Sequence, residues 1–136
     1  MSEEAPAGLS GTLRTWLRVE GLAVFAATLA LYVHDGGSLW LFVLLFLAPD
    51  LSMLAYLGGP VVGALGYNLV HTYSAPAVLA TVGVAGLPWA LPLALIWAAH
   101  IGFDRALGYG LKHRAGFGFT HLGRIGREAR AVPEAG

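Results

Sequence analysis

A long uncharged stretch constrains this chain more than any other feature. Between Asp50 and Asp104 there is no Lys, Arg, Asp or Glu. The whole chain is 57% hydrophobic and only 12% charged, whereas a soluble domain carries about 25% charged residues. We therefore predict a single integral membrane domain. The chain has no Cys, which excludes disulfides, thiolate nucleophiles and cysteine-ligated metals.

Four segments are apolar and long enough to cross a membrane, which takes about 20 residues. The predicted spans cover residues 16–33, 38–57, 60–85 and 88–108. Turns rich in glycine and proline separate them, and Ser38 is expected to cap the start of the second span. Pro49 and Pro76 should kink spans two and three. We favour one kinked third span over two helices divided at Ser74-Ala75-Pro76, because neither half could cross alone.

Positive charges predict the orientation. All eight Lys and Arg residues lie near the start of the first span or at and beyond the end of the fourth. Basic segments stay cytoplasmic, so both termini should lie inside. The predicted fold is an all-α, four-transmembrane-helix bundle over residues 14–110. A juxtamembrane Gly-rich basic segment should follow over 111–127, with disordered ends at 1–13 and 128–136.

Ionisable side chains gather at one depth of the predicted bundle. At 1.5 Å per residue, Asp50, His71, His100 and Asp104 all fall in the cytoplasmic half of the membrane. His100 and Asp104 are four residues apart and share a helix face. We predict one buried polar cluster from these four side chains. Other polar residues are expected around it, namely Glu20, Ser52, Tyr67, Asn68 and Arg105.

Two chemistries suit this cluster. Two imidazoles and two carboxylates form a ligand set for a divalent metal, Zn²⁺ above all. Asp50, His71, His100 and Asp104 would be the ligands, and His121 or a carboxylate not engaged by the metal, such as Asp104, would act as acid or base. This arrangement predicts a metal-dependent enzyme acting on a lipid or amphiphile. Without metal, the same groups can relay protons, as in a proton-coupled transporter or channel subunit.

A structural role competes with both chemistries. Polar groups between membrane helices contribute about 0.6 kcal/mol per pair as interhelical hydrogen bonds. For Asp50, His71 and His100 together we favour a functional site, because three ionisable groups at one depth are costly. For Asp104 and Glu20 taken alone we favour simple charge pairing near the interface, with partners for Asp104 among Arg14, Arg18 and Arg105.

The basic segment after the fourth span is unlike a helix, because glycines alternate with basic and aromatic residues over 108–127. For Lys112 and Arg114, as for Arg127 and Arg130, we favour contact with anionic lipid at the membrane surface. Alternatively the segment folds over the cytoplasmic mouth of the bundle. It would then bring His113 or His121 to the cluster, or hold an anionic headgroup or phosphate with Lys112 and Arg124.

Membrane lipid is the expected partner of this chain. Its few basic residues are accounted for by topology, so we do not expect nucleic acid. Small residues such as Gly63 and Gly66 suit packing within one chain and between chains equally well. The sequence therefore leaves open whether the chain forms a homo-oligomer.

Four ordered motifs resemble a known family. They are Pro49-Asp50-Leu51-Ser52-Met53, Tyr67-Asn68-Leu69-Val70-His71, His100-Ile101-Gly102-Phe103-Asp104-Arg105 and Thr120-His121-Leu122-Gly123. Together they resemble the small prokaryotic integral membrane proteins catalogued as domain of unknown function 4260, over roughly residues 14–126. The resemblance implies a multi-pass protein of a bacterial or archaeal cytoplasmic membrane. It implies no activity, because the family has none assigned.

Overall fold

The computed structural model describes residues 11–126, and these form a helical bundle with a small sheet at one end. The predicted disordered tail at 128–136 and most of the predicted disordered N-terminal segment lie outside the described residues, as do Arg127 and Arg130. The elements are α1 (Gly11–His34), α2 (Leu39–Phe46), the 3-10 helix η1 (Ala48–Gly58), α3 (Pro60–Val70), α4 (Ser74–Ala85), α5 (Ala90–Leu107), β1 (Lys112–His113), β2 (Gly116–Thr120) and β3 (Gly123–Arg124).

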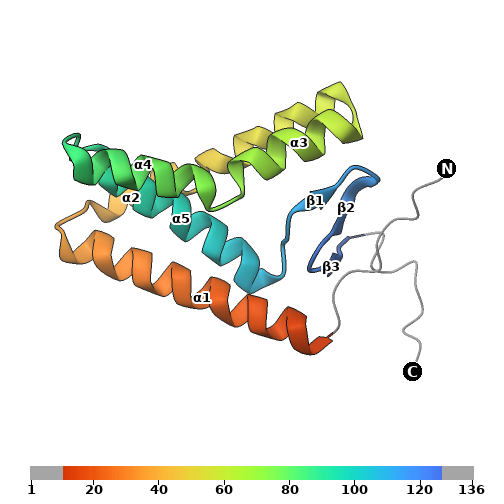
Figure 1. Cartoon of the computed structure of the whole chain (residues 1–136), viewed down its shortest axis with the longest axis horizontal. Coiled ribbons are helices and arrows are strands. Elements are labelled where there is room, and N and C mark those ends of the chain that lie inside the picture. Colours follow the sequence, from red (N-terminus) through yellow and green to blue (C-terminus); the bar gives the residue numbers. More distant parts are fainter. Residues whose placement is uncertain (1–10, 127–136) are drawn as a thin grey trace.

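The helices run up and down along one bundle, which confirms the predicted all-α fold (Figure 1). The chain passes along α1, returns through α2 and η1, passes again through α3 and α4, and returns through α5. Helix α5 packs against both α1 and α4. The α1–α2 and α4–α5 turns lie at one end of the bundle, and the sheet lies at the other (Figure 1).

Three helical segments among the described residues are long and apolar enough to cross a membrane. They are Gly11–His34, Leu39–Gly58 and Ala90–Leu107. Many large apolar side chains point outward, for example Leu65 at 71% exposure and Leu57 at 88%. A soluble monomer rarely exposes so much apolar surface to water. The chain is therefore an integral membrane protein.

The predicted third span is not one kinked helix, and this expectation is corrected. Helix α3 ends at Val70 and α4 begins at Ser74. Pro76 is the third residue of α4, where a helix has no partner for an amide proton; in an unbroken helix its ring would clash with the Thr72 carbonyl. Laid end to end, the two short helices reach about 35 Å at 1.5 Å per residue. They are therefore long enough to cross the bilayer only as a pair.

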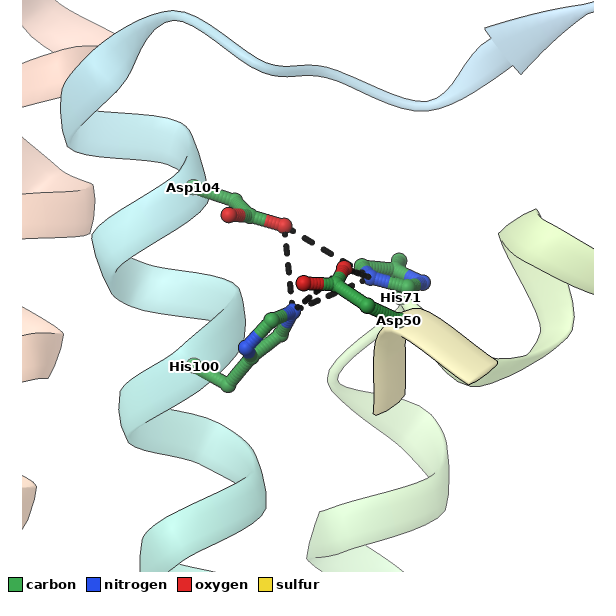
Figure 2. A group of neighbouring side chains, drawn as sticks. All are labelled: Asp50, His71, His100 and Asp104. Carbon is green, nitrogen blue, oxygen red and sulfur yellow. Dashed lines mark hydrogen bonds and ion pairs between the residues drawn. The ribbon is translucent and has the colours of Figure 1, made fainter. Parts of the chain in front are cut away.

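The second span changes from an α-helix to a 3-10 helix just before Pro49, the residue predicted to kink it. Helix α2 ends at Phe46, and the chain continues as η1 with Pro49 in its first turn. Ser38 caps α2 as expected, because the Leu41 amide donates a hydrogen bond to the Ser38 hydroxyl at 3.4 Å. The change from an α-helix to a 3-10 helix turns the next residue, Asp50, toward the bundle interior (Figure 2).

The Gly-rich segment forms a three-stranded antiparallel sheet in the order β1-β2-β3. The absence of a long helix agrees with the sequence, but no strands were predicted there. Strands β1 and β2 contact α3. The sheet is therefore held against the helical bundle, at the end that carries the polar cluster.

Helices α1 and α5 approach each other through two glycines. A Cβ atom on Gly102 would lie 2.7 Å from the Gly21 carbonyl oxygen and 2.8 Å from the Phe25 amide nitrogen. Both neighbours are backbone atoms and cannot rotate away. The contact therefore requires glycine, as small residues often allow close helix packing in membranes.

We predict that Gly102→Val lowers the melting temperature of the detergent-solubilised protein. The added methyl groups would overpack the α1–α5 contact, which typically costs about 1–3 kcal/mol and corresponds to a decrease of about 5–10 °C in a domain of this size. Gly11→Val is the matched control, because nothing lies within 4 Å of a Cβ atom there. Equal melting temperatures for the two variants would contradict the close packing.

Candidate metal centre

Four ionisable side chains from three parts of the chain converge on one point (Figure 2). Asp50 comes from the first turn of η1, and His71 is the capping residue that follows α3. His100 and Asp104 lie one turn apart on α5. The structure thus brings together the four side chains predicted to form the cluster.

The distances within the cluster are short and similar. The His100 Nε2 atom lies 3.3 Å from both Asp50 Oδ1 and Asp104 Oδ2. The His71 Nε2 atom lies 3.4 Å from Asp50 Oδ1 and 3.5 Å from Asp104 Oδ2. The two Nε2 atoms are 3.1 Å apart. One ligand atom from each residue lies within 4.8 Å of all the others.

These separations fit a tetrahedral metal site. Nitrogen and oxygen ligands bind Zn²⁺ at about 2.0–2.1 Å, which places tetrahedral ligand atoms about 3.3–3.4 Å from one another. Five of the six ligand pairs lie between 3.1 and 3.5 Å apart. Four lone-pair donors around one point would repel one another unless a proton or cation lay between them. The group can therefore hold a metal ion.

The environment of His71 leaves its Nε2 atom free to bind a metal. Its Nδ1 atom lies 2.9 Å from the Tyr67 carbonyl oxygen. Because a carbonyl oxygen can only accept, Nδ1 carries the proton and a neutral His71 presents an Nε2 lone pair to the cluster. The Tyr67 ring stacks on the His71 ring, with centroids 3.7 Å apart and planes 7° apart. His71 is thus fixed both in tautomer and in orientation.

His100 is held mainly by packing. The Phe46 ring meets its edge, with ring centroids 5.3 Å apart. The Nδ1 atom of His100 is buried and has no hydrogen-bond partner among residues 11–126.

The cluster is accessible from the carboxylate side. Both histidines are 1% exposed, whereas the side chains of Asp50 and Asp104 are 33% and 14% exposed. A cavity of about 490 Å³ opens beside the two carboxylates, between η1, the end of α5 and the sheet. Its lining includes Asp50, Tyr67, Asp104, Tyr109, Lys112 and Phe117.

Two side chains of α5 satisfy the carbonyl groups at the break that presents His71. The Trp97 indole N–H donates to the Val70 carbonyl at 2.7 Å, and the Arg105 guanidinium donates to the His71 carbonyl at 3.0 Å. Unpaired backbone groups in a membrane cost several kcal/mol each. Arg105 was expected beside the cluster; the structure assigns its hydrogen bonds to backbone carbonyls, including that of Tyr109.

Three other residues expected around the cluster have distinct contacts. The Tyr67 hydroxyl donates a long hydrogen bond to Asp104 Oδ2 at 3.5 Å. The Asn68 side chain binds the Lys112 backbone twice, donating to its carbonyl at 2.7 Å and accepting from its amide at 2.6 Å. The Ser52 hydroxyl donates to the Pro49 carbonyl at 2.7 Å. Only Tyr67 therefore touches the cluster through its hydroxyl.

Glu20 and His121 lie elsewhere. Both line a separate cavity of about 390 Å³ with Tyr73 and Arg105. The His121 Nδ1 atom accepts a hydrogen bond from the Leu111 amide at 2.8 Å. Sequence reasoning left His121 open as a group that approaches the cluster, and the structure does not bring it into the cavity beside the carboxylates.

The favoured sequence interpretation of Asp104, as the partner of an arginine, is corrected. Asp104 contacts both imidazoles of the cluster. The arginines nearby bind carbonyl groups instead, as Arg18 does with Ala106 at 2.8 Å. An i,i+4 histidine on the same helix face holds the Asp104 carboxylate more directly than the long, flexible arginine side chains do.

Lys112 is the residue that sequence reasoning placed wrongly. It was favoured as a surface cation on lipid, but it is only 5% exposed. Its Nζ atom lies 3.8 Å from the centroid of the Phe117 ring and 5.0 Å from that of Tyr67. The alternation of Gly and Phe before Thr120 was the available signal, because alternation is typical of a strand with one buried face.

We predict that Lys112 titrates near pH 8 in metal-free protein. Burial lowers the pKa of its ammonium from 10.5 to about 8, although Asp104 and Asp50 oppose the shift. The unfolded chain then binds the proton more tightly, so folding stability should rise as the pH increases from about 8 to 10.5. Lys112 is the single lysine, and ¹³Cε-labelled lysine gives one NMR signal to follow. A midpoint above pH 10 in the folded protein would contradict its burial.

We also predict that Asn68→Ala loosens the sheet. The variant loses both hydrogen bonds to the Lys112 backbone, each contributing about 1 kcal/mol. Hydrogen exchange measured by mass spectrometry should become about tenfold faster or more over 111–124. Thr81→Ala is the control, because the Thr81 hydroxyl donates only to Ala77 within α4. Unchanged exchange in the Asn68 variant would show that other contacts hold the sheet.

Comparison with known proteins places the chain in a family without assigning a function. A family model described as a domain of unknown function, DUF4260, matches residues 14–125. No curated protein and no solved structure matches. The family model covers most of the chain, including all four cluster residues. The chain therefore belongs to the family described as domain of unknown function 4260.

Proposed function

We propose that this protein is a metal-dependent membrane hydrolase that acts on a lipid or a related amphiphile. The observation that carries the proposal is the set of ligand separations, five of which match the edges of a small tetrahedral site. Side chains that only hold helices together need no such common point. The four cluster residues lie among apolar helices, and this limits the substrate to molecules that enter the membrane.

The metal would be held by His71, His100 and Asp104, and Asp50 would lie beside the fourth tetrahedral position, which a catalytic site keeps for water. Imidazole and carboxylate ligands in a tetrahedral arrangement favour Zn²⁺. When bound, such an ion supplies Lewis acidity and makes water a nucleophile near neutral pH. A histidine binds a metal as a neutral imidazole with its lone pair toward the ion. The hydrogen bond between His71 and Tyr67 supports this state for His71.

Asp50 is the better candidate for proton transfer. It is the more exposed carboxylate, at 33% against 14% for Asp104, and it lies in the first turn of η1. Asp104 is held by the Tyr67 hydroxyl. Asp50 would take a proton from the attacking water and give it to the alcohol that leaves, so the products are an acid and an alcohol.

An apolar groove beside the cluster supports an amphiphilic substrate. It has a volume of about 390 Å³, and its lining includes Pro49, Val70, Ile96 and Trp97. Pro49 and Val70 directly precede Asp50 and His71, while Ile96 lies one turn before His100 on the side away from the sheet. The cluster therefore lies between an apolar groove and a polar cavity, which is the arrangement that a molecule with an acyl chain and a polar headgroup requires.

Charge distribution supports placement in a prokaryotic inner membrane with both termini in the cytoplasm. Arg14, Arg18, Lys112 and Arg124 belong to the start of α1 and to the sheet, at the same end of the bundle (Figure 1). The turns at the opposite end contain Asp35 and no Lys or Arg. By the positive-inside rule the sheet faces the cytoplasm, and the cluster lies in the inner half of the bilayer.

Proton relay is the second candidate function. The 3.1 Å separation of the His71 and His100 Nε2 atoms suits one proton shared between two imidazoles. A transport path would have to continue across the membrane, however, and the neighbouring groove is lined by apolar side chains such as Leu45, Leu79 and Leu93. Within residues 11–126 the relay would therefore have a proton site that borders an apolar groove, and we rank it below the hydrolase.

We predict about one divalent ion per chain in protein purified in mild detergent. His71→Ala/His100→Ala should reduce the metal content at least tenfold, because it removes both nitrogen ligands. Elemental mass spectrometry measures the ion, and circular dichroism checks the helical fold. His34→Ala/His113→Ala is the matched control, since neither residue belongs to the cluster.

Two outcomes decide the proposal. Metal retained by the control and lost by a folded cluster variant would support the site and justify a screen of ester and phosphoester lipids. Metal absent from the parent protein, even after Zn²⁺, Fe²⁺ and Mn²⁺ are added back, would reject the metal-dependent enzyme. The Nε2–Nε2 pair would then favour proton relay.

A further inference from the structure

We propose that the cavity under the sheet binds the phosphate headgroup of an anionic amphiphile, with the Lys112 ammonium as its ligand. The assignment of this amphiphile as the substrate rests on the proposed hydrolase function. The binding itself rests on the contacts of Lys112 and on the positive charge that the cavity would carry once the proposed metal is bound. This proposal narrows the expected substrate from any membrane amphiphile to one that carries a phosphate group.

Lys112 is 5% exposed and lines the cavity without an anionic partner of its own among the described residues. Among residues 11–126, Lys112 forms no ion pair, because no carboxylate oxygen lies within 4.0 Å of its Nζ atom. Its neighbours are the faces of Phe117 and Tyr67. A cation–π contact attracts a cation but satisfies none of its hydrogen-bond donors. The ammonium lines the cavity together with Asp50 and Asp104.

The charges around the cavity leave a surplus of positive charge once a metal is bound. The carboxylates of Asp50 and Asp104 would neutralise a divalent ion, since both histidines are neutral ligands. Asp50, Asp104 and Lys112 are the charged side chains in the cavity lining. Among the described residues that line the cavity, none then offers Lys112 a counter-charge. Leaving a buried ammonium uncompensated is costly, and an anionic ligand is the natural compensation.

A phosphate suits the place of Lys112 relative to the cluster. The ammonium and the two carboxylates face one cavity of about 490 Å³, so an anion there lies between a lysine and the metal site. Phosphate offers several acceptor oxygens and can satisfy both at once. The apolar groove is lined by Leu93, Ile96 and Trp97, which precede His100 on α5, and the acyl chain would therefore extend away from the sheet.

The sheet fixes Lys112 at this place. Both backbone polar groups of Lys112 are bound by Asn68 of α3, and Phe117 from β2 closes over the ammonium. The Lys112 side chain therefore has little freedom to leave the cavity and reach the lipid headgroups around the protein. Arg124 on β3 offers a comparison, because it also lies over an aromatic ring, that of Phe119 at 5.4 Å, yet does not line this cavity.

The test uses zinc-treated full-length protein in neutral detergent. The probe is an ether-linked dioctylglycerol phosphonate, which resists hydrolysis, and calorimetry measures its affinity. We expect Lys112→Met to weaken binding about tenfold or more, as the loss of one charge-assisted hydrogen bond predicts. Arg124→Met should bind within about twofold of the parent protein, because a screened surface cation contributes little.

Two further arms identify the ligand. Dioctylglycerol without the phosphonate should leave the ¹³Cε signal of Lys112 unchanged, whereas the phosphonate should shift it. Inorganic phosphate should bind far more weakly than the phosphonate. If inorganic phosphate binds equally well, the assignment to a lipid headgroup is overturned.

The outcome separates this inference from the proposed function. Equal phosphonate affinity in the parent protein and in Lys112→Met, with metal present in both, would overturn the inference and leave the metal-dependent enzyme standing. Absence of metal in all samples would reject the enzyme, while Lys112-dependent binding would still establish the anion site. Metal content is therefore measured on each sample before calorimetry.

Discussion

The structure depends on one break in a membrane helix and on the side chains that satisfy it. Helix α3 stops at Val70, and the freed carbonyl groups of Val70 and His71 accept hydrogen bonds from Trp97 and Arg105 of α5. Irregular backbone within a membrane persists only when its polar groups find partners inside the protein. The same helix, α5, supplies His100 and Asp104, so the element that stabilises the break also completes the cluster.

Both interruptions of the spans serve the site in the same way. Asp50 lies in the first turn of η1, after α2 ends, and His71 is the residue that caps the end of α3. A residue at a helix end can point along the bundle axis toward a common centre, which a residue in mid-helix cannot do as readily. Two interrupted segments and one regular helix therefore converge on a single point, while continuous apolar surface remains on the outside.

The sequence predicted much of this and failed for definable reasons. Depth counting and the i,i+4 spacing of His100 and Asp104 were enough to assemble the cluster, because both depend only on helix geometry. The break at 71–73 was missed because it depends on tertiary hydrogen bonds from α5. The burial of Lys112 was missed because its strand contacts Asn68, which is 44 residues away in the sequence.

The sheet gives the polar cavity its second wall, and this is where a substrate headgroup would be selected. Residues of the sheet and of the segment before it line the same cavity as Asp50 and Asp104, so the two carboxylates share that cavity with Lys112. The Asn68 contacts join the helix that ends in His71 to the strand that begins with Lys112. A shift of the sheet would therefore move the lysine relative to the cluster, so the position of one backbone segment sets both the access to the metal site and the charge that a ligand meets there.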